Sequence, residues 1–184
     1  MRVGCFAGRF MRTAARGRRR LKPLRQWICD ECHRVIRAPE EGWVEWLIES
    51  RSRKQKGFRI VHFRAYSPRR PQAYCHIYRE QRQQDGADEL VDEVYLTHFV
   101  DRGSIPVLLS FIDPGPYVEK EYSGPKVLDF REWTEFARRL TIPYYEEARF
   151  YLTRAARDGF LQSTYEPEIY YPANLRQVIE RYAR

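Results

Sequence analysis

The sequence predicts an α+β protein in which a β-rich N-terminal part precedes a mostly helical C-terminal part. In residues 26–80, short runs of aromatic and β-branched residues alternate with turn-forming residues, a pattern typical of strands. In residues 90–184, apolar residues recur every three or four positions, as they do along one face of a helix. The polar segment at residues 81–89 indicates a linker between the two modules.

Positive charge is concentrated at the N-terminus. The chain has 184 residues and a formal net charge of +8, and residues 1–25 hold nine of its Lys and Arg residues and no Asp or Glu. The rest of the chain is therefore close to neutral. We expect residues 1–25 to form a flexible basic arm that attracts phosphate groups, with the triplet Arg18, Arg19 and Arg20 near its end. The alternatives are a solvated extension without a partner and an organelle transit peptide.

The composition narrows the class of protein. Hydrophobic residues make up 43% and aromatic residues 15% of the chain, which is enough for a packed core. No apolar run approaches the roughly 18 residues that span a bilayer. We therefore expect a soluble, cytoplasmic protein without a membrane partner. In that reducing compartment, the four cysteines indicate a metal site rather than disulfide bonds.

A Cys-x-x-Cys motif opens the β-rich module. Cys29 and Cys32 have the spacing with which two thiolates bind one zinc ion from a tight turn. A tetrahedral site needs two more ligands, and we expect His62 and Cys75 to supply them, with His76 as the alternative to His62. Cys75 and His76 are adjacent, so their side chains diverge in extended backbone and rarely share one ion. The zinc ion is expected to be structural, because such sites supply folding energy to modules with small cores.

The residues after the motif predict a β-hairpin. Residues 43–49 and 58–64 are rich in aromatic and β-branched residues and indicate two strands, and residues 50–57 between them form a basic loop. A cysteine knuckle followed by such a hairpin resembles zinc-ribbon and treble-clef modules, over about residues 27–80. The resemblance implies that the metal fixes the hairpin against the knuckle. The alternatives are reduced cysteines buried as small apolar residues and a redox-active Cys-x-x-Cys.

The second half is predicted to be mainly helical. Residues 90–100 indicate a short helix, and residues 103–112 form another short apolar segment. Residues 129–140 place aromatic and aliphatic side chains on one face and indicate a longer helix. Residues 143–158 begin with a proline and precede a glycine, which are typical start and stop signals of a helix. A final helix is expected after Pro172.

The predicted helix pair resembles a winged helix-turn-helix in layout, over residues 129–171. In that interpretation, residues 143–158 would enter a DNA major groove. Glu146 and Glu147 argue against it, because carboxylates at the leading end of such a helix repel phosphates. The alternative is an antiparallel helix pair that closes the core.

These observations predict a non-enzymatic, zinc-stabilised regulatory protein that binds nucleic acid through its basic arm and loops. A protein–protein adaptor with the same structural zinc site is the alternative. A zinc-dependent nuclease or hydrolase comes third and no catalytic residue is assigned. Glu45 is a conceivable base beside His62, but Phe63 stands where such a nuclease needs a second histidine. The residues expected to contact nucleic acid are Arg18, Arg19, Arg20, Arg51, Arg53, Lys54, Lys56, Arg69 and Arg70.

Overall fold

The computed structural model of the chain describes residues 20–69, 74–76, 78, 89–117, 124–162 and 165–183. Residues 1–19 of the expected arm and residues 81–88 of the expected linker lie outside the described residues. The described part of the chain forms antiparallel sheets and short helices, so the predicted α+β class is confirmed. None of the helices described is long and apolar enough to cross a membrane.

Two sheets, both antiparallel, occupy the first half of the fold. In the smaller sheet, β1 (Trp27–Ile28) pairs with β2 (Val35–Ile36). The expected hairpin is confirmed, because its two strands are neighbours in the larger sheet, whose order is β4-β3-β5. The strands of the larger sheet are β3 (Gly42–Glu49), β4 (Gln55–His62) and β5 (Glu89–Tyr95).

Strand β5 corrects the helix that was expected over residues 90–100. Residues 89–95 pair with β3 along their whole length, and only the next four residues, Leu96–Phe99, turn into a 3-10 helix. The helix prediction was wrong because an apolar segment this short fits both helical and strand periodicity. Pairing with β3 decided between them, and that contact is not visible in the local sequence.

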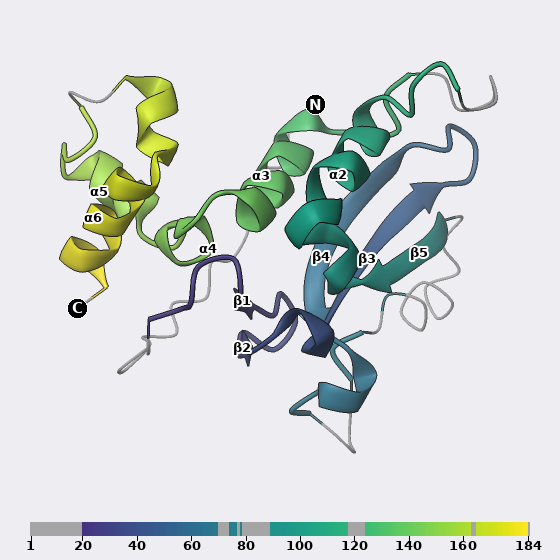
Figure 1. The fold of residues 1–184 in the computed structure, drawn as a ribbon, viewed down its shortest axis with the longest axis horizontal. Helices are drawn as coiled ribbons and strands as arrows, with labels where there is room; N and C mark the ends of the chain where they lie inside the picture. Colours follow the sequence, from purple (N-terminus) through teal and green to yellow (C-terminus); the bar gives the residue numbers. More distant parts are fainter. Residues whose placement is uncertain are drawn as a thin grey trace, which may run out of the picture.

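The core lies between one face of the larger sheet and two helices. Trp46 of β3 and Phe58 of β4 lie on the sheet face that α2 and α3 cover in Figure 1. The rings of Trp46 and Phe111 have centroids 5.4 Å apart, and those of Phe58 and Trp133 are 4.8 Å apart. These aromatic contacts fix the helices to the sheet. The helices are α2 (Ser104–Ile112) and α3 (Phe130–Thr141).

Two of the predicted helices are confirmed and a third is interrupted. Helix α3 begins after Asp129, whose side chain accepts hydrogen bonds from two backbone N–H groups of the first turn. The helix after Pro172 is confirmed as α6. The single helix expected over residues 143–158 is instead two short helices, because Tyr144 has a left-handed backbone, with φ 70°, and residues 149–151 form a turn. The C-terminal helices, grouped beyond the end of α3 in Figure 1, are α4 (Tyr145–Ala148), α5 (Leu152–Arg157) and α6 (Pro172–Tyr182).

Helix α4 lies inside the protein. All four of its residues are buried, and the helix contacts β1 and α6. Residues 145–148 are thus not on a surface that could enter a DNA groove. Short 3-10 helices connect the elements, namely η1 (Pro39–Glu41), η2 (Arg64–Tyr66), η3 (Leu96–Phe99), η4 (Asp101–Gly103) and η6 (Glu166–Tyr170).

One hydrophobic cluster joins the stretches expected to form separate modules. It contains Trp27 and Ile60 from residues 26–80 and Phe99 and Trp133 from residues 90–184. Residues of both stretches therefore share one core and one sheet. That the two stretches fold independently stays a prediction.

The last residues of the expected arm contact the C-terminal helices. The backbone N–H of Leu21 donates a hydrogen bond of 2.8 Å to Glu147, and Arg20 pairs with Glu180 at 3.7 Å. Residues 20–25 are therefore placed against the folded body of the protein.

Candidate metal centre

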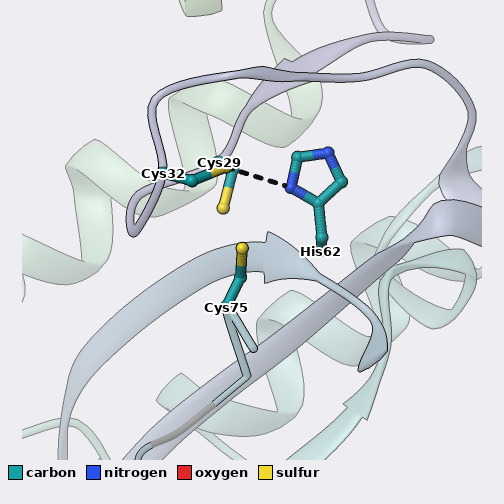
Figure 2. Close-up of side chains that lie close together, drawn as sticks. All are labelled: Cys29, Cys32, His62 and Cys75. Carbon is teal, nitrogen blue, oxygen red and sulfur yellow. Dashed lines mark hydrogen bonds between the residues drawn. The ribbon is translucent and has the colours of Figure 1, made fainter. Parts of the chain in front are cut away.

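The Cys-x-x-Cys motif forms a tight knuckle between β1 and β2. The N–H of Cys29 donates to the carbonyl of Arg34, and the N–H of His33 donates to the carbonyl of Cys29, each at 2.9 Å. His33 has a left-handed backbone, with φ 58°, which reverses the chain after Cys32. The turn brings the two cysteine side chains to the same side, as Figure 2 shows.

His62 and Cys75 complete a four-residue cluster with the knuckle. The donor atoms of Cys29, Cys32, His62 and Cys75 all lie within 4.8 Å of one another, and Figure 2 shows them pointing toward a common centre. The Sγ of Cys32 is 3.5 Å from Nδ1 of His62. In a tetrahedral zinc site with ordinary bond lengths, this sulfur–nitrogen edge is about 3.6 Å. The cluster could therefore hold a metal ion.

A hydrogen bond to the backbone orients His62 for coordination. Its Nε2 lies 3.3 Å from the carbonyl oxygen of Val35, which can only accept, so Nε2 carries the proton. The neutral ring then presents the lone pair of Nδ1 to the cysteines. Such outer hydrogen bonds are the usual way in which a metal-binding histidine is held in one tautomer.

The electrostatics of the cluster favour positive charge. Burial alone would lower the pKa of His62, but hydrogen bonding to Cys29, Cys32 and Cys75 outweighs burial and raises the pKa to about 12. A divalent cation supplies the same positive charge while the imidazole stays neutral and the sulfurs are thiolates.

His76 does not lie in the cysteine cluster. Its side chain lies between Glu45 of β3 and Glu93 of β5, and these three residues form a second group with metal-ligating donors within 4.8 Å of one another. Burial raises the pKa of Glu45 to about 7, with Arg59 and the N–H of Tyr78 opposing the shift.

The register of the hairpin separates Glu45 from His62. Glu45 pairs with Arg59 and His62 pairs with Gly42, so the expectation of Glu45 as a base beside His62 is wrong. The sequence could not give this register, because strand ends alone do not fix which residues face each other.

A buried ion-pair network holds the other side of the knuckle. Arg139 of α3 is 2.8 Å from Asp30, between the two cysteines, and 2.7 Å from Glu146 of α4. Burial raises the pKa of Asp30, but Arg139 and Arg149 outweigh burial and hold it below its ordinary value. Glu146 also accepts a hydrogen bond from the N–H of Ile28, at 2.9 Å. The network thus joins the knuckle to α3 and α4.

Among the described basic residues that were expected to contact nucleic acid, some are exposed and others are paired with acidic or backbone groups. Arg51 and Arg53 are exposed at the tip of the β3–β4 hairpin. Lys54 donates to the carbonyl of Pro125, and Lys56 pairs with Glu49 and Glu89. Arg69 pairs with Glu31, and Arg20 with Glu180. Arg18, Arg19 and Arg70 lie outside the described residues.

Sequence reasoning missed the Glu45 cluster and the Arg139 network. A signal for the first was available, since Glu45 interrupts the apolar run of a predicted strand. No such signal marked Arg139, whose partner Asp30 is 109 residues away. Comparisons with protein-family models, with curated proteins and with solved structures give no match, so the geometry of the chain carries the interpretation.

Proposed function

We propose that the chain is a non-enzymatic, zinc-stabilised regulatory protein that binds nucleic acid through basic residues of its N-terminal arm and loops. The observation that carries the zinc part is the cluster of three cysteines and one histidine described above. Three thiolates and one imidazole form a soft ligand set that suits Zn²⁺ and disfavours Mg²⁺ or Ca²⁺.

The geometry supports a structural ion over a catalytic one. Four protein donors complete a tetrahedron, whereas catalytic zinc sites keep one position open for water. The ligands come from the knuckle, from the end of β4 and from the segment after η2. An ion here joins three stretches that are distant in sequence, which is the usual contribution of structural zinc to folding.

Arg51 and Arg53 support the nucleic-acid part of the proposal. They are exposed at the hairpin tip, where guanidinium groups are able to pair with phosphate oxygens in two parallel hydrogen bonds. The arm adds positive charge over residues 1–25, which contain no acidic residue. Together these regions suit an extended polyanion better than a single small anion.

The test is the salt dependence of binding to a mixed-sequence DNA duplex, with single-stranded RNA as a second probe. We expect affinity to fall steeply between low and moderate salt, because binding releases counterions. Deleting residues 1–19 keeps the contact of Leu21 with Glu147 and should lower the slope. Replacing Arg51 and Arg53 by Gln should lower it by up to about 2, while the exposed pair Arg131 and Arg157, replaced in the same way, serves as the matched control.

Two results contradict this proposal. One is the absence of binding to both probes at low salt. The other is a salt slope that is unchanged by the truncation and by the hairpin-tip variant. The first result removes nucleic acid as the partner, the second removes the arm and the hairpin tip as its contacts, and both leave the proposed zinc site standing.

An adaptor role is the second candidate, and α2 favours it. Ile105 and Leu109 are four residues apart, so they share one face of the helix, and they are 60% and 58% exposed. Contiguous exposed apolar surface is a feature of protein interaction sites, and this pair would form the centre of such a surface. The adaptor role predicts that Ile105→Asp with Leu109→Asp abolishes a protein contact without changing any salt-dependent nucleic-acid binding. The measurement is co-purification with and without the two substitutions, and equal recovery of partners contradicts it.

A further inference from the structure

Three metal-ligating side chains meet beside the cysteine cluster. Glu45, His76 and Glu93 come from β3, from the residue after Cys75 and from β5. The exposed fractions of their side chains are 0%, 8% and 21%. The group is thus buried except on the side of Glu93.

The sheet register sets two carboxylates against each other. Glu45 of β3 is directly opposite Glu93 of β5. Like charges in such cross-strand pairs are destabilising unless a positive group lies between them. Arg59, opposite Glu45 on the other side, donates to Oε1 of Glu45 at 2.6 Å and also pairs with Glu31 at 3.4 Å. Its charge is therefore shared, and Oε2 of Glu45 is left facing His76.

We propose that Glu45, His76 and Glu93 bind a second divalent cation, of the class that accepts mixed nitrogen and oxygen ligands, with Zn²⁺ or Mn²⁺ as representatives. Two carboxylates and one imidazole are a ligand set that these ions accept. Nε2 of His76 lies 3.7 Å from Oε2 of Glu45. The corresponding nitrogen–oxygen edge of a tetrahedral zinc site is about 3.4 Å.

The surroundings orient the ligands for this role. The N–H of Tyr78 donates to Oε2 of Glu45 at 3.2 Å, and Arg59 holds the other oxygen of that carboxylate. Trp43 packs against the ring of His76 with centroids 5.3 Å apart. Such outer contacts fix the direction of first ligands in metal sites. Glu93 contacts Nε2 of His76 directly and, being the most exposed of the three, is the ligand able to rotate when an ion enters.

The two sites are linked through one peptide bond. Cys75 belongs to the cysteine cluster and His76 to the second cluster. The two neighbouring side chains belong to different clusters, so one dipeptide is able to serve two ions. This also explains why His76 does not replace His62 as a ligand of the first site. An ion bound at Cys75 positions His76 for the second ion.

A protonated His76 that pairs with both glutamates is the competing occupant, and metal content separates the two. The protein is incubated with excess Zn²⁺ and desalted, and zinc is counted by atomic emission. We expect about two equivalents for the native sequence and about one for Glu93→Gln. The matched control is Glu89→Gln, also on β5, which pairs with Lys56 and lies outside the cluster. It should retain about two equivalents.

Cobalt substitution assigns the lost ion. Thiolate-to-cobalt charge-transfer absorption reports the cysteine site alone, because the second cluster has no sulfur. We expect Glu93→Gln to halve the bound Co²⁺ while this absorption per chain is unchanged. An endpoint near one equivalent in the native sequence overturns the proposal without recourse to any variant. So does a Glu93→Gln protein that binds as much metal as Glu89→Gln.

Discussion

The knuckle at Cys29 and Cys32 is held on its two sides by different chemistry. On one side, sulfur and imidazole donors from β4 and from the Cys75 segment face the two cysteines. On the other side, Arg139 and Glu146 from α3 and α4 hold Asp30 and the backbone of Ile28. In the proposed zinc site, the first side gains its bonds from an ion taken up from solution, whereas the ion pairs of the second side are formed within the chain itself.

This difference matters for how the protein responds to its surroundings. Metal binding depends on ion supply and on competing ligands, because its free energy is part of the folding free energy. A buried ion-pair network does not depend on them, but it cannot lose one member cheaply. The knuckle is thus expected to loosen from the hairpin when metal is removed, while its link to α3 depends on Arg139.

The largest effect is expected from breaking the metal side. Cys29→Ser removes one of the four proposed ligands, and structural zinc sites contribute about 10 kcal/mol or more of apparent binding free energy, comparable to the whole stability of a domain. We expect loss of the cooperative thermal transition. The control is His33→Asn, next to the motif and exposed, with a residue that tolerates its left-handed backbone. A Cys29→Ser protein that unfolds like the control contradicts the metal's structural role.

The second effect comes from breaking the ion-pair side. Arg139→Met removes the nearest cation from buried Glu146 and half-buried Asp30, leaves only Arg149 beside them, at 3.3 and 3.6 Å, and should cost about 3 kcal/mol. Urea denaturation measures the change in unfolding free energy. Arg131→Met, on the exposed side of the same helix, is the control and should change it little. Equal midpoints for the two variants would mean that the network adds nothing to the knuckle's attachment.

A third variant tests the packing that neither metal nor charge explains. A Cβ at Gly42 would lie 2.5 Å from Cδ2 of Leu96 and 3.3 Å from Cγ2 of Ile36. Gly42→Ala should therefore cost about 1–3 kcal/mol through overpacking where β2, β3 and η3 meet. Gly103→Ala, whose Cβ meets only the carbonyl oxygen of His98 at 3.5 Å, is the control. Thermal unfolding with metal present separates them, and a stable Gly42→Ala protein argues against close packing here.

The smallest effect on the free energy of unfolding is expected from the N-terminal cap of α3, the helix that carries Arg139. Asp129 caps this helix by accepting from the N–H groups of Arg131 and Glu132. Asp129→Ala should cost about 1 kcal/mol, whereas Asp129→Asn keeps the cap and should cost little. Urea midpoints of the two variants provide the comparison. If Asp129→Ala also weakens zinc retention, the two sides of the knuckle are coupled through α3.

Sequence patterns predicted those parts of the fold that depend on near neighbours. The β3–β4 hairpin, α3 with its apolar face and α6 after Pro172 all follow from local spacing and end signals. Strand β5 and the division of the expected helix 143–158 into α4 and α5 did not follow. The first depends on pairing with β3, and the second on the burial of α4 between β1 and α6.

The candidate site divides in the same way. The spacing of Cys29 and Cys32 indicated half of a metal site, and Cys75 with His62, or with His76 as the alternative, was predicted to supply the other half. The Glu45 cluster needed the register of three strands, and Arg139 needed the packing of α3 on the knuckle. The burial of a charged residue is seen only in the tertiary structure, because nothing in its local sequence distinguishes it from a charged residue on the surface.

The most direct test of the metal-linked knuckle combines zinc content with the near-ultraviolet circular dichroism of the purified protein. Trp27 is fully buried in the knuckle, and its Nε1 donates to the carbonyl of Arg139 at 3.1 Å, so it contributes to this spectrum together with the other buried aromatic side chains. We predict tightly bound zinc whose removal by a strong chelator weakens the spectrum, with recovery when zinc is returned. A zinc-free protein with the same spectrum and the same unfolding midpoint would contradict the account.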